Sequence, residues 1–217
     1  MIVMPANNTG AVVGWLAGRF PERVGHLYSI GSFRGPYEFL PYALDNGRYP
    51  CWANGYKWDE RQYIGLLDRV AQCGQAPKWA LVPDVVADAE ATLREWDAWA
   101  VRVQQYGWPL AFAAQDGHTP DDVPSEAEVV FVGGTTDWKR RTIHQWCEAF
   151  PRVHVGRINT GKWLWECHRA GAESCDGTGW LRGDKVQLAG LVSYLERSAD
   201  GLGEPQGQLF CRPEVAP

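Results

Sequence analysis

Short apolar runs alternate with longer amphipathic segments along most of the chain, and this alternation constrains the fold more than any other feature. The runs that predict strands are residues 24–30, 39–44, 79–82, 110–114, 129–132, 153–155 and about 173–175. The segments that predict helices are residues 59–73, 87–106, 137–150, 162–170 and 184–198. Strands separated by helices indicate parallel crossover connections. Seven or eight such strands in 217 residues favour a single compact α/β fold, a (β/α)8 TIM-like barrel, over an open doubly wound sheet.

One domain accounts for the pattern. We expect the barrel to occupy residues 1–200 and residues 201–217, with their Gly and Pro residues, to form an irregular C-terminal tail. Residues 31–41 and 46–56 are rich in Gly, Pro and aromatic side chains and are interpreted as loops.

Charge and cysteine usage narrow the class of protein. The net charge of −5 argues against a protein that wraps nucleic acid by broad electrostatic attraction. The six cysteines lack CxxC spacing, and the first ten residues lack a basic stretch followed by a long apolar core. No apolar run approaches the roughly 18–20 residues that span a bilayer. We therefore expect a cytoplasmic protein with free thiols and no membrane segment.

Polar or glycine-containing motifs follow directly on five of the apolar runs. They are residues 45–49 (DNGRY), 83–84 (PD), 115–117 (QDG), 133–136 (GGTT) and 176–179 (DGTG). In a parallel barrel these positions meet at the face that carries active sites. Each Asp, Asn or Gly taken singly is equally at home in a turn or a helix cap. The five together predict one polar site.

Two carboxylates in one pocket suit chemistry at a glycosidic bond. One can attack the anomeric carbon while the other manages the proton of the departing group. The motifs after the strands contain several carboxylates, and Asp84 and Gln115 carry the donors and acceptors that reading the edge of a nucleobase requires.

These motifs, in this order, resemble the tRNA-guanine transglycosylase superfamily, over about residues 40–180. The greater similarity is to its phage- and bacteria-encoded DNA branch (DpdA-type), which inserts 7-deazaguanines into DNA. The resemblance implies that Asp176 is the nucleophile and Asp45 the general acid/base. It also implies a base-binding set: Tyr49 stacks on the base, Asp84 and Gln115 read its edge, and Gly133 and Gly134 offer backbone donors.

The chain departs from the family in two respects. The tRNA enzymes carry a zinc site of clustered Cys and His after the nucleophile, whereas only Cys211 follows Asp176 here. We therefore expect no metal, and no organic cofactor is needed because the free base is the second substrate. Absence of the zinc segment argues against tRNA and favours DNA or a smaller substrate. Asn46 and Arg48 stand where the family has small residues, so the base chosen is open.

Other polar and aromatic residues carry weaker predictions. Arg157, Asn159, Arg182 and Lys185 are candidates for contacts with nucleic acid, with turn and helix-start roles as the alternative. Residues 139–141 (KRR) are interpreted as a solvated helix face, with phosphate contact as the alternative. Trp52 and Trp58 are candidates for contact with an extruded base. His118, His144 and His154 receive no role.

The leading hypothesis is a DNA guanine transglycosylase with DNA and a free 7-deazaguanine as partners, acting in the host cytoplasm if it is phage-encoded. The alternatives are the same exchange on tRNA, a glycosidic-bond hydrolase with the same carboxylates, and a barrel that binds a nucleobase or protein without turnover. The negative charge adds the hypothesis that a partner protein delivers the DNA. Nothing in the sequence indicates an oligomeric state.

Overall fold

The computed structural model describes residues 1–6 and 10–205. In this part of the chain, eight parallel strands form one sheet in the order β1-β8-β7-β6-β5-β4-β3-β2. The strands are β1 (Ile2–Pro5), β2 (His26–Tyr28), β3 (Tyr42–Leu44), β4 (Ala80–Leu81), β5 (Leu110–Ala114), β6 (Val129–Val132), β7 (Val153–Val155) and β8 (Ser174–Gly177). Bridges from Val3 to Val24 and from Ala6 to Leu27 nearly close the sheet between β1 and β2. The predicted (β/α)8 TIM-like barrel is confirmed.

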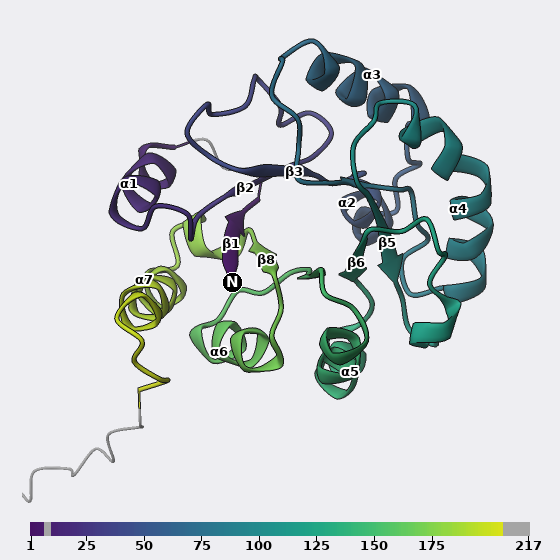
Figure 1. Ribbon diagram of the computed structural model, residues 1–217. Coiled ribbons are helices and arrows are strands. Elements are labelled where there is room, and N and C mark those ends of the chain that lie inside the picture. Colours follow the sequence, from purple (N-terminus) through teal and green to yellow (C-terminus); the bar gives the residue numbers. More distant parts are fainter. Residues whose placement is uncertain (7–9, 206–217) are drawn as a thin grey trace, which may run out of the picture.

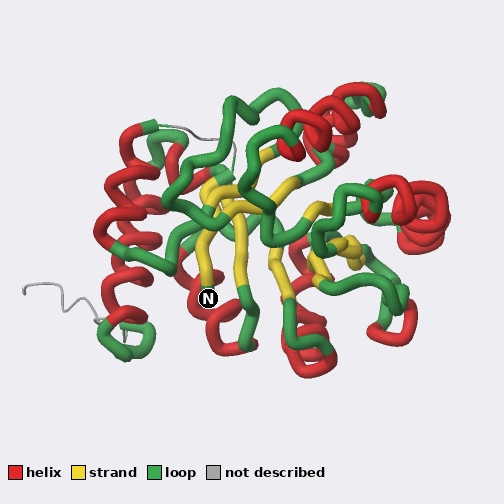
Figure 2. The backbone as a smooth tube through the Cα atoms, turned by 45° about the horizontal axis from the view of Figure 1, so that its top comes forward, coloured by secondary structure: helices red, strands yellow, loops and turns green. Residues whose placement is uncertain are grey.

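Helices surround the strands (Figure 1), and the tube view shows the strands gathered at the centre (Figure 2). They are α1 (Ala11–Arg19), α2 (Arg48–Asn54), α3 (Glu60–Ala71), α4 (Ala89–Gln104), α5 (Thr136–Ala149), α6 (Gly161–Ala170) and α7 (Lys185–Ala199). The five predicted helices correspond to α3–α7, each within two residues at either end. Side-chain caps explain this agreement, because Asp59, Asp88 and Asp184 accept hydrogen bonds from the first backbone amides of α3, α4 and α7.

Helix α2 corrects the prediction that residues 46–56 form a loop. Pro50 is its third residue, where a missing N–H breaks no intrahelical hydrogen bond. Gly47 and Gly55 flank the helix at φ values of 74° and 68°, a left-handed conformation that glycine adopts without strain. Strand β1 and helix α1 were also not predicted from the sequence.

The alternation of side chains along the strands separates two layers of core. One layer fills the barrel interior and includes Met4, Leu27, Trp79, Leu81 and Phe131. The other lies between the strands and the helices, where Leu44, Val82 and Val155 face outward. The same alternation sends every second residue near a strand end toward the barrel axis, and this decides which side chains reach the site.

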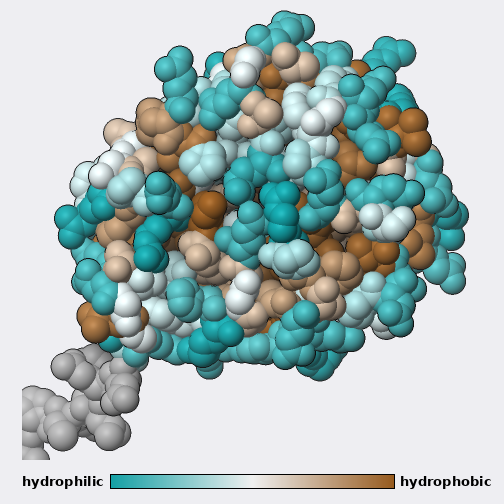
Figure 3. Space-filling model, in the orientation of Figure 1, coloured by the Kyte–Doolittle hydropathy of each residue, from teal (hydrophilic) through white to brown (hydrophobic). Residues whose placement is uncertain are grey.

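The surface of the described residues is mixed in polarity. Hydrophilic residues lie across the middle of the face in Figure 3, with hydrophobic residues between them in separate patches. No helix in residues 1–6 and 10–205 combines the length and the apolar character needed to cross a bilayer. Helix α7 ends at Ala199 and residues 202–205 have no regular structure; the rest of the predicted tail, residues 206–217, lies outside the described residues.

Candidate active site

A cavity of about 510 Å³ lies at the C-terminal ends of the strands. Ten of the eleven predicted site residues line it: Asp45, Tyr49, Asp84, Gln115, Gly133, Gly134, Arg157, Asn159, Asp176 and Arg182. Lys185 does not line it and is exposed as the first residue of α7. The structure therefore brings together residues that are up to 137 positions apart in the chain (45 to 182).

Asp176 is the most firmly held carboxylate of the cavity. It is the third residue of β8 and is only 5% exposed. Its Oδ1 accepts a hydrogen bond from the Arg157 backbone N–H at 3.2 Å and lies 3.1 Å from Nε2 of the buried His154. These two contacts compensate the charge of a carboxylate that lines the cavity.

Asp45 has surroundings of a different kind. It follows the last residue of β3 and lies near both Asp176 and Asp84. Burial, reinforced by the negative charges of those two carboxylates, raises the pKa of Asp45 to about 7, against weaker opposition from hydrogen bonds with Ser29 and Gly47. A carboxyl group with this pKa can both give and take a proton near neutral pH.

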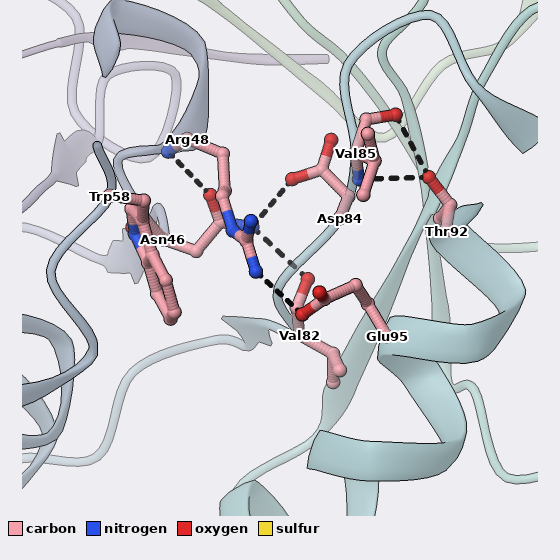
Figure 4. A network of polar contacts seen from close by, with 8 residues as sticks. All are labelled: Asn46, Arg48, Trp58, Val82, Asp84, Val85, Thr92 and Glu95. Carbon is pink, nitrogen blue, oxygen red and sulfur yellow. Dashed lines mark hydrogen bonds and ion pairs between the residues drawn. The ribbon is translucent and has the colours of Figure 1, made fainter. Parts of the chain in front are cut away.

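Asp84 is the third carboxylate, and both of its oxygens accept hydrogen bonds, one of them from Asn46 (Figure 4). Asn46 Nδ2 donates to Oδ1 at 2.8 Å, and Gln115 Nε2 donates to Oδ2 at 2.6 Å. Burial raises the pKa of Asp84, while the Asn46 hydrogen bond and the Arg48 charge act in the opposite direction. Asn46, one of the departures from the family motif, thus serves to orient Asp84.

The other departure, Arg48, does not line the cavity and reaches Glu95 of α4 (Figure 4). Its guanidinium pairs with Glu95 at 2.5 Å and lies 4.1 Å from the centre of the Trp58 ring. Trp58 donates its indole N–H to the Asn46 carbonyl at 2.8 Å and packs against Tyr63. Trp58 therefore supports the loop after β3 and does not line the cavity, and its contact with an extruded base stays a prediction. Trp52 is 56% exposed and stays a candidate.

Gln115 is tied into the protein by most of its amide group. Its Oε1 accepts hydrogen bonds from the backbone amides of Ala87 and Gly134, each at 2.9 Å. Its Nε2 donates one hydrogen to Asp84, which leaves one amide hydrogen for a ligand. The 2% exposure of Gln115 fits this role as a fixed reader rather than a mobile one.

Gly133 and Gly134 contribute by leaving room for neighbouring side chains, and their amides are not free donors. The Gly133 amide donates to the Ala114 carbonyl at 2.9 Å, and the Gly134 amide donates to Gln115. These bonds correct the prediction that both amides are free for a base. A Cβ atom on Gly133 would lie 2.8 Å from Gln115 Nε2, so a side chain there would displace the fixed amide.

Tyr49 and Arg157 form one wall of the cavity. The Arg157 guanidinium lies 4.3 Å from the centre of the Tyr49 ring and donates to the Gly134 carbonyl. Arg157 has a φ of 60°, a strained value for a residue with a side chain, and this conformation is coupled to its backbone bond to Asp176. One face of Tyr49 is thus covered by Arg157, and a base that stacks on Tyr49 uses the opposite face or displaces the guanidinium.

The remaining predicted contacts divide in two. The Asn159 Oδ1 accepts the Gly179 amide at 2.8 Å, so this side chain joins the loops after β7 and β8. Arg182 is exposed at the edge of the cavity and forms no ion pair with another described residue. Of the predicted nucleic-acid contacts, Arg182 alone is both exposed and part of the cavity lining.

Lys139 does not lie on a solvated face, as was expected of residues 139–141. It is 1% exposed and donates to the Gly156 carbonyl just beyond β7. Burial, with the nearby Arg157 charge, lowers the pKa of Lys139 to about 7.

His154 is the site residue that sequence reasoning left without a role. It stands between two outward-facing valines of β7, so strand alternation alone directs its side chain into the barrel. This alternation can be seen in the sequence. The contact between His154 and Asp176 cannot, because the two residues are 22 positions apart.

Within the described ranges, no group of three or more His, Cys, Asp or Glu side chains is placed to hold a metal ion. Cys211 lies outside the described residues. Comparison with known proteins finds no matching family model and no matching curated protein. The function is therefore argued from the site itself.

Proposed function

We propose that this protein is a DNA guanine transglycosylase that exchanges guanine in DNA for a 7-deazaguanine, such as 7-cyano-7-deazaguanine. One observation carries the proposal: Asp176 and Asp45 line one cavity in unlike surroundings. Asp176 is held by donors to its Oδ1, whereas burial and neighbouring charge raise the pKa of Asp45 to about 7. Base exchange with retention requires this division between a nucleophile and a proton carrier.

The steps follow from these roles. Asp176 attacks C1′ of the target nucleotide, the C1′–N9 bond breaks, and the departing guanine takes a proton from Asp45. The sugar is then held on Asp176 as an ester. The incoming 7-deazaguanine gives its ring N–H proton to Asp45, its nitrogen attacks C1′, and the Asp176 carboxylate leaves. Two inversions give net retention, and no cofactor takes part.

One feature favours exchange over hydrolysis. Asp84 and Gln115 form a fixed polar edge in the cavity, and such an edge is suited to selecting an incoming base. The cavity volume of about 510 Å³ is within the range of pockets that enclose a ligand of this size.

The test is incorporation of 7-cyano-7-deazaguanine into duplex DNA, single-stranded DNA and tRNA, measured by mass analysis of the nucleosides. Wild type is compared with Asp176→Ala and with a control, Asp116→Asn. Asp116 lies just after β5 and accepts a hydrogen bond from the backbone amide of Thr135, which caps α5. It does not line the cavity. We expect incorporation into DNA by wild type and the control, and none by Asp176→Ala.

Other outcomes identify the alternatives. Modification of tRNA alone would identify tRNA as the substrate and leave the base-exchange reaction as proposed. Release of guanine without incorporation would indicate a hydrolase. No change in any polymer, with wild type folded, would refute the proposal.

A further inference from the structure

A buried serine and histidine stand in line behind Asp176. His154 on β7 and Ser174 on β8 are register partners, and both side chains point into the barrel. The His154 Nδ1 lies 2.8 Å from the Ser174 hydroxyl, and Nε2 lies 3.1 Å from Asp176 Oδ1. Both His154 and Ser174 are 0% exposed, so neither side chain can touch a substrate in the cavity.

The hydrogen-bond partners define which ring nitrogen carries the proton. The Asp176 carboxylate only accepts, so Nε2 must donate to it. In the neutral ring Nδ1 then accepts, and the Ser174 hydroxyl supplies the donor. The line therefore runs Ser174 O–H to His154 Nδ1, and His154 Nε2–H to Asp176 Oδ1.

Aromatic rings hold the imidazole in this orientation. The Phe131 ring stacks on His154 with centres 4.9 Å apart and planes 25° apart, and the Trp79 ring meets it edge-on, also at 4.9 Å. These contacts leave the imidazole no room to turn away from Asp176.

The two oxygens of Asp176 are consequently unequal. Oδ1 receives His154 Nε2–H and the Arg157 backbone N–H. Among the residues that the structure describes, none donates a hydrogen bond to Oδ2, while Asp176 lines the cavity. Fixing one oxygen aims the other.

We propose that His154, held by Ser174, is a positioning residue that anchors Oδ1 of Asp176 and so presents Oδ2 as the attacking atom. This inference rests on the proposed function, because it names how the nucleophile of that reaction is held. It also assigns a role in the second half of the reaction. The bond from Nε2–H is stronger to a carboxylate than to an ester, so His154 favours departure of Asp176 when the incoming base attacks.

A pair of substitutions tests the role. His154→Gln keeps an N–H donor that can reach Oδ1, whereas His154→Met removes it at similar volume. We expect His154→Met to lower kcat for base exchange about 10- to 100-fold, the size of a lost hydrogen bond to a charged group, with KM for DNA unchanged. His154→Gln restores most of the loss. A merely structural role would not produce this rescue at matched thermal stability.

Adduct trapping and a milder variant complete the kinetic test. Denatured His154→Met enzyme quenched during turnover should retain a larger fraction of DNA bound to Asp176 than wild type, because release of the ester is slowed. Ser174→Ala removes only the hydroxyl and should lower kcat a few-fold. Wild-type kcat in folded His154→Met would overturn the inference and leave the proposed function standing.

Nuclear magnetic resonance separates the two proposals. In protein with 15N-labelled histidine, we expect ring signals of His154 with the proton on Nε2, and a change in these signals in Asp176→Asn. A proton on Nδ1 alone would overturn the inference whatever the activity. If wild type exchanges no base while the Nε2–H signal responds to Asp176→Asn, the anchoring of Oδ1 is supported and the proposed function is refuted.

Discussion

Replacing Asp45 by asparagine should stabilise the fold and abolish base exchange. The pKa of Asp45 lies at about 7 in the folded protein against an ordinary value of 3.8. Between these values the folded protein keeps a proton that the unfolded chain has released, so the free energy of unfolding falls as pH rises through this window. A difference of about three pH units, at about 1.36 kcal/mol each, gives a cost of about 4 kcal/mol above pH 7.

The side-chain amide introduced by Asp45→Asn carries no ionisable proton and keeps an acceptor for the Gly47 amide. The stability advantage of Asp45→Asn over wild type should therefore grow by about 2 kcal/mol between about pH 5.5 and pH 8, and then level off. Urea denaturation at fixed temperature across this pH range measures the difference, and subtraction of wild type cancels other titrating groups that are independent of Asp45.

The control is Asp59→Asn, at an exposed carboxylate that caps α3. Its hydrogen bond from Gln62 and other donors lower the pKa of Asp59, so its titration is complete below this range and the difference from wild type should stay flat. An equally flat difference for Asp45→Asn would refute the assignment of a neutral-range pKa to Asp45. A gain in stability with exchange activity intact would refute its role as proton carrier.

Two further predictions concern the support of the site. The pKa of Lys139 is lowered to about 7, so Lys139→Met should be most stabilising near neutral pH, and its advantage in urea denaturation should shrink by about 2 kcal/mol by pH 9, the opposite sign to Asp45→Asn. A gain that grows with pH would contradict this. Gly134→Ala should cost about 2–4 kcal/mol more than Gly74→Ala. Both sites have positive φ, but only a Cβ at Gly134 would lie 2.4 Å from Trp138, and equal thermal shifts would exclude crowding as the cause.

The fold was predictable because its signals are local. Capping aspartates mark where α3, α4 and α7 begin, and apolar runs such as residues 110–114 are strands on both counts of length and composition. Helix α2 was missed because it is short, contains Pro50, and is flanked by Gly47 and Gly55 rather than by capping side chains.

The residues that line the cavity were predictable for a similar reason, whereas the hydrogen bonds between them were not. In a parallel barrel, a polar residue just after a buried strand lies at the C-terminal face. This rule correctly placed Asp45 and Gln115 at the cavity. The bonds from Gln115 to Asp84 and to the Gly134 amide depend on distances between separate strands, and a single sequence contains no such distances. The prediction of free glycine donors failed for that reason.

The hydrogen bonds between the lining residues determine what the cavity can do. Asn46 and Gln115 each donate a hydrogen bond to Asp84, so the polar edge is ordered before any ligand arrives. Little conformational entropy is then lost when a ligand binds. The groups left to react or to bind a ligand are few: Oδ2 of Asp176, the carboxyl group of Asp45 with its raised pKa, and one amide hydrogen of Gln115. A rigid frame around one aimed oxygen and one proton carrier is what a displacement at a sugar carbon needs, because neither reacting group then has to move far as charge develops.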